Sequence, residues 1–502
     1  MTNGQTNKSI LLQKERNAEP IEFKVTARLE SEPQKEISRV HTVGAFSKIT
    51  SKDIEDGKAN VQGVLSVCAL YETSEGEFAQ AKQEANFSVP IQVFGASMLL
   101  VDVVMVNYDV LGFDDNTITV NLLLNANVIE IVSEEVSKEI EVAEGLVFDK
   151  ATKNVSKVLG AGSCIFNVNQ EVDAVMPNTT RIVNRNATVV ITNAFAGIDV
   201  VTVEGNIFCT LLIEKDGKLE NFKKVIDFKQ EMECFGANPG SVVEAKAQVS
   251  SFMTGIIQDE QNSILSLVCE LSAFAVSHAS EEVEVINDAY SITQNVSLTT
   301  EAVTCYEINN AEYSSIDVTL SADITGRLGI DEVVGVLRTD VKDVYVKVKD
   351  GIMLLEGVVE TVICYNNNMD ETTQTIASVC PLLVERQIDE PYVDACDFNF
   401  IVNGFKLKTG NAVEIEGTLY FKQTDKIQKQ VSYISNIEFS GEEKPQNSAI
   451  KVYIVGENER IFDIAKNLGV TVDNLLTQNP DLENGVVPGE KIYVYVPLVV
   501  NF

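Results

Sequence analysis

The sequence predicts a mainly β protein: three tandem, antiparallel, sandwich-like repeat units followed by a small α+β module. Three observations predict this fold. Apolar and polar residues alternate with period two over most of the chain, one Gly-containing strand pattern recurs three times, and helical spacing appears only after about residue 455. With 502 residues the chain is too long for one hydrophobic core, and 45% apolar residues suffice for several.

The strand prediction depends on alternating segments such as 343–349 and 412–421. Successive side chains of a strand point to opposite faces, so alternation gives one buried and one solvent-facing side. Val, Ile, Thr, Phe and Tyr predominate in these segments, as strands prefer. The body of the chain is therefore predicted to be antiparallel β structure.

Three apolar strands, each with an internal glycine, indicate an internal repeat. They lie at 61–71, 203–213 and 355–365, and their glycines are 142 and 152 residues apart. These repeat landmarks are Gly63, Gly205 and Gly357. Glycine inside a strand marks a bulge or a close packing contact.

The repeat spacing and the composition divide the chain into six segments. Residues 440–448 are polar, contain Gly and Pro and have no apolar pattern, so they predict a flexible linker. We predict a flexible N-terminus at 1–14, repeat units at 15–148, 149–300 and 301–440, a linker at 441–449 and a C-terminal module at 450–498.

The C-terminal module combines strands with helical spacing. A strand at 451–455 precedes apolar residues at helical spacing over 461–468. Gly469 suits a helix C-cap and Thr471 an N-cap of a second helix. A Pro488–Gly489 turn then leads into a last strand, so the predicted order is strand, helix, helix, strand.

Composition restricts the function. The net charge of −35 and the pI of about 4.4 exclude nucleic acid and anionic lipid surfaces as partners, since both require clustered Lys and Arg. The acidity serves solubility or attracts a basic partner surface. The N-terminus lacks a signal sequence and no long apolar run follows, so we expect a cytoplasmic protein without membrane insertion. Nine cysteines without a CxxC motif fit reduced surroundings.

Chemistry-bearing motifs are scarce. The chain has two histidines, His41 and His278, and neither lies in a catalytic or metal-binding motif. The glycines of 160–162 lack the following helix that a phosphate loop needs. We therefore predict no catalytic residues, no metal site and no cofactor.

The module resembles a LysM domain. The matching segments are 455–466, 469–471, Asn479–Pro480 and 488–494. In glycan-binding LysM domains a Gly-Asp-Thr loop helps to hold N-acetylglucosamine. Here Asn458, Glu459 and Arg460 take its place, and the large Arg460 weakens the expectation of sugar binding.

The repeats resemble the spore-coat-associated (SPOCS, DUF3794) domain of sporulating Firmicutes. The clearest local match is 285–291, which contains the landmark Tyr290, with the Gly-strand-Tyr pattern at 63–71 and 357–365. Three such repeats followed by one LysM module resemble clostridial spore-coat morphogenetic proteins. The resemblance implies a non-enzymatic scaffold of the mother cell. Its LysM module would bind the coat ATPase SpoIVA, and the complex would encase the forespore as part of the spore coat.

Two alternatives stay open at this point. The repeats are a second candidate surface, for other coat morphogenetic proteins. A peptidoglycan-binding LysM protein, which would recognise an N-acetylglucosamine polymer, is the alternative function, and it would need an unrecognised route of export.

Partner contacts are expected on the module surface, with Arg460 and Lys466 as charged anchors, because Arg is frequent among interface hot spots. The predicted partner-binding residues are Arg460, Phe462, Lys466 and Tyr493, although Phe462 suits core packing as well. The predicted module core contains Ile461, Ile464, Ala465, Leu468 and Leu475.

Overall fold

The computed structural model describes residues 10–496 with short gaps. The gaps are 56, 139, 141–142, 175–179, 259–262, 325–329, 370–371, 389–392, 409–411 and 445–448. Parts of two predicted segments, 1–9 of the N-terminus and 445–448 of the linker, therefore lie outside the described residues, as do 497–498 of the module. Strands dominate the rest, in agreement with the predicted mainly β class.

In the part of the chain that the structure describes, nineteen strands precede the module and form three groups, which we call the first, second and third units. The first unit contains β1 (Ile10–Asn17), β2 (Ile21–Glu30), β3 (Ile37–Glu55), β4 (Lys58–Thr73), β5 (Phe78–Gln92), β6 (Ala96–Phe113) and β7 (Thr117–Ser137). The second contains β8 (Leu146–Ala174), β9 (Arg181–Ala196), β10 (Val200–Lys215), β11 (Lys218–Glu233), β12 (Val242–Gln258) and β13 (Ser263–Ser291). The third contains β14 (Gln294–Asp323), β15 (Ile330–Lys349), β16 (Ile352–Asn367), β17 (Thr372–Gln387), β18 (Val393–Lys408) and β19 (Ala412–Glu443).

The three units pair their strands in the same order. In the second unit β13 lies between β8 and β12, and β10 lies between β9 and β11. The third unit repeats this with β14-β19-β18 and β15-β16-β17. In the first unit β7 lies between β2 and β6, β4 lies between β3 and β5, and a single β2–β5 pair joins the two groups. All pairs are antiparallel. Each unit therefore has one layer of three consecutive strands and a second layer in which a strand from the start of the unit joins the last two.

The layers of each unit share one apolar core. In the second unit, Val203 and Leu211 from β10 pack with Leu267 and Leu271 from β13, and all four are fully buried. Equivalent clusters fill the first and third units. Such burial of alternate residues on two facing sheets is the sandwich arrangement that the period-two pattern predicts.

Each landmark glycine faces a bulge in the neighbouring strand. Gly63 lies opposite the β3 irregularity between Ile49 and Ser51, and Gly205 lies opposite one in β9. A Cβ atom on Gly205 would lie 2.2 Å from the Val190 carbonyl oxygen and 2.8 Å from the Phe228 ring. Glycine is required there because the bulged strand and an aromatic ring both approach the backbone.

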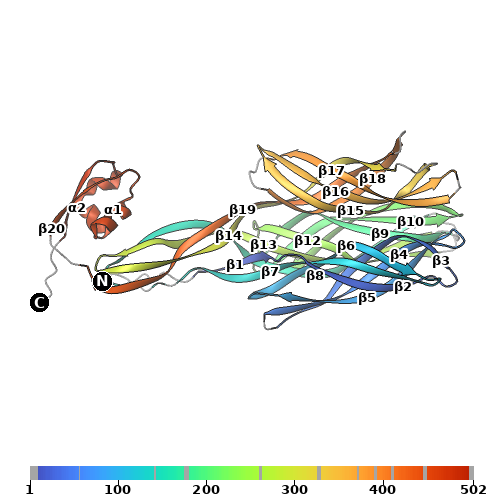
Figure 1. The fold of residues 1–502 in the computed structure, drawn as a ribbon, viewed down its shortest axis with the longest axis horizontal. Helices are drawn as coiled ribbons and strands as arrows, with labels where there is room; N and C mark the ends of the chain where they lie inside the picture. The colour runs from blue at the N-terminus through green and yellow to red at the C-terminus, as the bar shows by residue number, and fades with distance from the viewer. Residues whose placement is uncertain are drawn as a thin grey trace.

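Beyond the units, three two-stranded ribbons continue as a stalk (Figure 1). The ribbons are the β1–β7 pair, the outer half of the β8–β13 pair and the outer half of the β14–β19 pair. Leu12, Val155, Val283 and Val303, one or two from each ribbon, share a buried cluster. The long strands of the second and third units therefore connect the sandwiches to a remote tip.

The C-terminal module lies at the end of this stalk (Figure 1). Its elements are β20 (Ala449–Ile454), α1 (Ile461–Leu468), α2 (Val472–Gln478), the 3-10 helix η1 (Pro480–Asn484) and β21 (Lys491–Val496), in the predicted order. Gly469 ends α1 with a φ of 66°, and the Thr471 hydroxyl accepts a hydrogen bond from the Asn474 amide. No helix in the described part of the chain reaches the length and apolar character of a membrane span.

Several segment boundaries differ from the predicted ones. Strand β1 begins at Ile10, within the N-terminus predicted to be flexible at 1–14, because it pairs with β7. The predicted starts of the second and third units, 149 and 301, lie inside β8 and β14. Strand β19 continues to Glu443, into the predicted linker at 441–449, because β14 pairs with it that far. Ribbon pairing at the stalk explains all of these differences.

We expect Gly205→Ala to lower the free energy of unfolding by about 1–3 kcal/mol, because the added methyl group has no space. Gly255→Ala, in β12 of the same unit, is the matched control because no atom lies within 4 Å of the position that its added Cβ would take. The control should change stability by less than about 0.5 kcal/mol. Thermal unfolding followed by circular dichroism measures both, and equal stabilities would contradict the role of Gly205.

Candidate functional site

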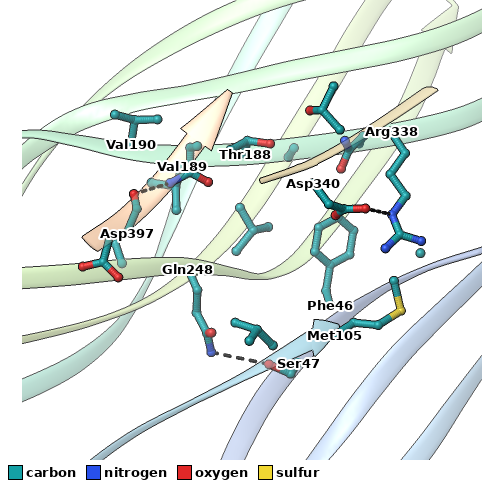
Figure 2. A pocket seen from close by; sticks show the side chains of 18 of the residues that line it. Phe46, Ser47, Met105, Thr188, Val189, Val190, Gln248, Arg338, Asp340 and Asp397 are labelled. Atoms are coloured by element: carbon teal, nitrogen blue, oxygen red, sulfur yellow. Dashed lines mark hydrogen bonds and ion pairs between the residues drawn. The ribbon is translucent and has the colours of Figure 1, made fainter. Parts of the chain in front are cut away.

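A cavity of about 400 Å³ lies where the three units meet. Figure 2 shows that its walls come from all three: Phe46 and Met105 from the first unit, Val189 from the second, and Arg338 and Asp397 from the third. The units therefore pack around a shared centre, not as a row of independent domains.

Arg338 joins the first and third units at the edge of this cavity. Its Nε atom lies 2.5 Å from Asp340 Oδ2, and Nη1 donates to the Val43 carbonyl oxygen at 3.1 Å. The guanidinium also lies 5.2 Å from the centre of the Tyr108 ring. Burial raises the pKa of Asp340, and the guanidinium of Arg338 opposes that rise. The donors of Arg338 are thus engaged between two units.

A buried ion network continues from the cavity wall. Lys246 Nζ lies 3.1 Å from Asp102 Oδ2 and 2.8 Å from Asp397 Oδ1. Lys422 Nζ lies 3.1 Å from Glu244 Oε1 and 3.9 Å from Asp397 Oδ2. Burial by itself lowers the pKa of both lysines, but the surrounding carboxylates more than compensate and raise it above its usual value. The five side chains come from all three units, and the two lysines stay charged.

The same network reaches strand β1 through His278. The Nε2 atom of His278 lies 3.4 Å from Glu244 Oε2 and 3.7 Å from Glu15 Oε2. The other carboxylate oxygens of these two residues contact Lys422 and Lys426. One imidazole and two carboxylates within 4.8 Å could hold a metal ion. A divalent cation there would be repelled by two adjacent ammonium groups, so the arrangement fits an ion network better.

The second histidine links the first unit to the third. His41 Nδ1 lies 2.8 Å from the Thr375 hydroxyl, and its ring stacks on Phe78 at 4.7 Å. Burial lowers the pKa of His41 from 6.5 to about 4, and the nearby Arg39 charge contributes to this lowering. Glu72 Oε2, 3.3 Å from Nε2, opposes this effect. His41 therefore stays neutral in the folded protein at neutral pH.

The predicted partner residues of the module lie at the stalk tip. Arg460 Nη1 lies 2.6 Å from Asp149 Oδ2, and its Nε atom lies 3.0 Å from Asp463 Oδ2. Lys466 Nζ lies 2.5 Å from Asp288 Oδ2. Both charged anchors are thus paired with carboxylates of the β8–β13 ribbon.

Phe462 also faces the ribbon. Its exposed fraction is 8%, and its ring makes an edge contact with the landmark Tyr290 at 5.2 Å. The Tyr290 hydroxyl donates to the Val470 carbonyl oxygen at 2.7 Å. The structure therefore brings three of the four predicted partner residues together on one face, which contacts the chain itself. Tyr493, the fourth, is 54% exposed and lies elsewhere.

The predicted core residues Ile464, Ala465, Leu468 and Leu475 are buried, and Ile461 is partly buried against them. The chain turns before α1: Asn458 has a φ of 61°, which asparagine tolerates, and Glu459 accepts a hydrogen bond from the Gly456 amide at 2.7 Å.

The outer face of the module sheet was not predicted as a surface feature. Ile450, Val452 and Ile454 on β20 lie beside Tyr493 and Tyr495 on β21, and all five are more than half exposed. The sequence contains a signal for this surface. Four of the five residues in Ile450–Ile454 are apolar, with Lys451 as the exception, so the strand has apolar residues on both of its faces. Apolar surface gathered in this way is typical of contact sites.

Part of the second unit matches a known protein family. Residues 179–257, which span β9 to most of β12, match the family model described as SipL, SPOCS domain. This match supports a SipL-like protein with a sporulation or spore-coat role. No curated protein matches the chain, and no solved structure does either.

We expect Lys422→Met to lower the free energy of unfolding by about 3–5 kcal/mol, because it leaves buried carboxylates without their partner. Lys347→Met removes an exposed ion pair of the same unit and should cost less than about 1 kcal/mol. Denaturant unfolding compares the two variants. Similar losses would show that the buried network does not hold the units together.

Acid should destabilise the protein through His41. Between pH 6.5 and 4 the unfolded chain binds a proton that the folded chain excludes, so stability falls by up to about 3 kcal/mol as the pH is lowered. His41→Gln should flatten the pH dependence of the unfolding temperature over this range. Glu72→Gln should instead steepen it, because it removes the carboxylate that favours the imidazolium. A wild-type slope in both variants would contradict this account.

Proposed function

We propose that this chain is a non-enzymatic, SipL-like scaffold of spore-coat assembly. The observation that carries the proposal is the match of residues 179–257 to the SipL, SPOCS domain family. The common strand order of the three units supports the further proposal that all three are repeats of this domain type. In that role the protein would act in the mother-cell cytoplasm and be recruited to the forespore surface.

We further propose that the C-terminal module is a LysM-type fold used to bind the coat ATPase SpoIVA. The strand–helix–helix–strand order, the Gly469 cap and the Thr471 cap support a LysM-type fold. Its position at the end of the stalk supports a role in reaching a partner away from the units. The units themselves are proposed to carry contacts to other coat morphogenetic proteins.

The surroundings of Arg460 favour a protein partner over a glycan. The guanidinium stands in the loop that holds the sugar in glycan-binding LysM domains, and it is fixed there by Asp149 and Asp463. A sugar would have to enter beside a large side chain that is engaged in two ion pairs. Peptidoglycan binding is therefore the alternative that the experiment below has to exclude.

The test compares the full chain with a chain that ends at Lys444. The full chain should capture purified SpoIVA and stay in solution with insoluble peptidoglycan, and the shortened chain should lose capture while its circular dichroism shows intact strands. Sedimentation of the full chain with peptidoglycan, competed by chitin oligomers, would support the alternative. Equal capture by both chains would place the partner site on the units.

A further inference from the structure

The contact between the module and the stalk tip has the composition of a recognition site. We define the basic face of the module as Arg460, Phe462, Lys466 and Val470, and the ribbon tip as Val147, Asp149, Asp288, Tyr290 and Ile292. We infer that the basic face recognises an aromatic ring flanked by carboxylates, that the ribbon tip occupies this face within the chain, and that the protein partner presents the same chemistry and displaces it. The inference rests on the proposed function.

The charges of the contact are complementary in a chain that is otherwise acidic. With 74 Asp and Glu against 39 Lys and Arg, the chain has far more carboxylates than cations. Both cations of the basic face are satisfied by ribbon carboxylates, Arg460 by Asp149 and Lys466 by Asp288. A partner that binds these cations displaces the ribbon carboxylates. It therefore has to present carboxylates of its own, because a cation that loses its charged partner also loses a stabilising hydrogen bond.

The aromatic part of the contact is as specific as the charged part. Tyr290 is 3% exposed, and it belongs to the same apolar cluster as the module core. Its ring meets Phe462 edge to face at an interplanar angle of 68°, while its hydroxyl reaches a carbonyl oxygen that follows α1. Burial raises the pKa of Tyr290 to about 12, so the hydroxyl remains a donor at neutral pH. An aromatic ring that carries a hydroxyl donor therefore makes both contacts of this position, the edge contact with Phe462 and the hydrogen bond to the carbonyl oxygen.

The ion pairs between the basic face and the ribbon tip are weak enough to be exchanged. The side chains of Arg460 and Lys466 are 54% and 39% exposed, and exposed ion pairs of this kind contribute little stability each. Among the described residues of the module and ribbon tip, the hydrogen bonds that join them run through side chains, not through a strand ladder. A partner that also packs a ring against Phe462 can therefore compete with the ribbon tip.

The outer sheet face of the module stays exposed while the basic face is covered. The five apolar residues of the outer sheet face are more than half exposed, so the ribbon tip does not cover them, and the neighbouring edge of β21 is already closed by Gln478 and Asn479, whose side chains bond its backbone. A partner can thus make first contact there before the basic face is released.

The experiment uses the full chain with Asp149→Lys and Asp288→Lys together, which repel Arg460 and Lys466. The matched control is Glu282→Lys with Glu438→Lys, which makes the same change in net charge at exposed stalk positions away from the module. Hydrogen exchange measured by mass spectrometry should show faster exchange at 286–292 and 461–470 in the first variant only. Capture of the purified coat ATPase should become about threefold to thirtyfold tighter, as expected when two such ion pairs no longer compete.

A third variant tests the chemistry itself. Adding Lys466→Gln to the opened chain should abolish the gain in capture while exchange stays fast, because the neutral side chain offers the partner's carboxylate no cation and forms no ion pair with the lysine introduced at position 288. Unchanged exchange in the opened chain would overturn the internal contact, and unchanged capture in it would overturn the competition. Full capture by the third variant would overturn the recognition chemistry. Absence of capture by every chain, including the unaltered one, would count against the proposed function together with the recognition of that partner.

Discussion

The ammonium groups of Lys246 and Lys422 lie among carboxylates that come from all three units, namely Asp102, Glu244 and Asp397. A buried ion pair rarely adds much net stability, because desolvation offsets the Coulomb attraction, but breaking one is costly. The network therefore acts mainly as a geometric constraint. Any sliding or separation of one unit would leave a partly buried charge without its partner.

The fixed arrangement of the units also determines the direction of the stalk. Strands β8, β13, β14 and β19 run without interruption from the sandwiches into the ribbons, so the orientation of the units fixes that of the ribbons. In the first unit the equivalent strand is divided into β1 and β2 around Pro20, which lacks the amide donor that a continuous ladder needs. Glu15, on the short β1 strand, nevertheless joins the network through Lys426. The position of the module, remote as it is, depends on contacts made between the units.

Local sequence patterns predicted the strands, the landmark glycines and the module elements, because each depends on residues close together in the chain. Gly205 and Thr471 are examples, since a bulge opposite one and a helix start at the other follow from local geometry. The ribbons and the ion network could not be predicted in this way. Glu15 and Lys426 lie in different units and hundreds of residues apart, and nothing in their surroundings marks them as partners. Arg460 and Lys466 were predicted as contact residues from their chemistry, yet their contacts within the chain depend on where the stalk ends.

These contacts show how the acidity of the chain affects its structure. Excess carboxylates keep the protein soluble and repel copies of itself, but they also surround every cation with competitors for its charge. Where a cation is only 12% exposed, as at Lys422, this competition produces a fixed pair between units. Where a cation is half exposed, as at Lys466, it produces a weak pair that another acidic surface can replace. The same excess of negative charge can therefore hold the body of the protein in one arrangement and leave the basic face of the module exchangeable. The difference between the two outcomes is set by burial, which decides how strongly water screens each pair.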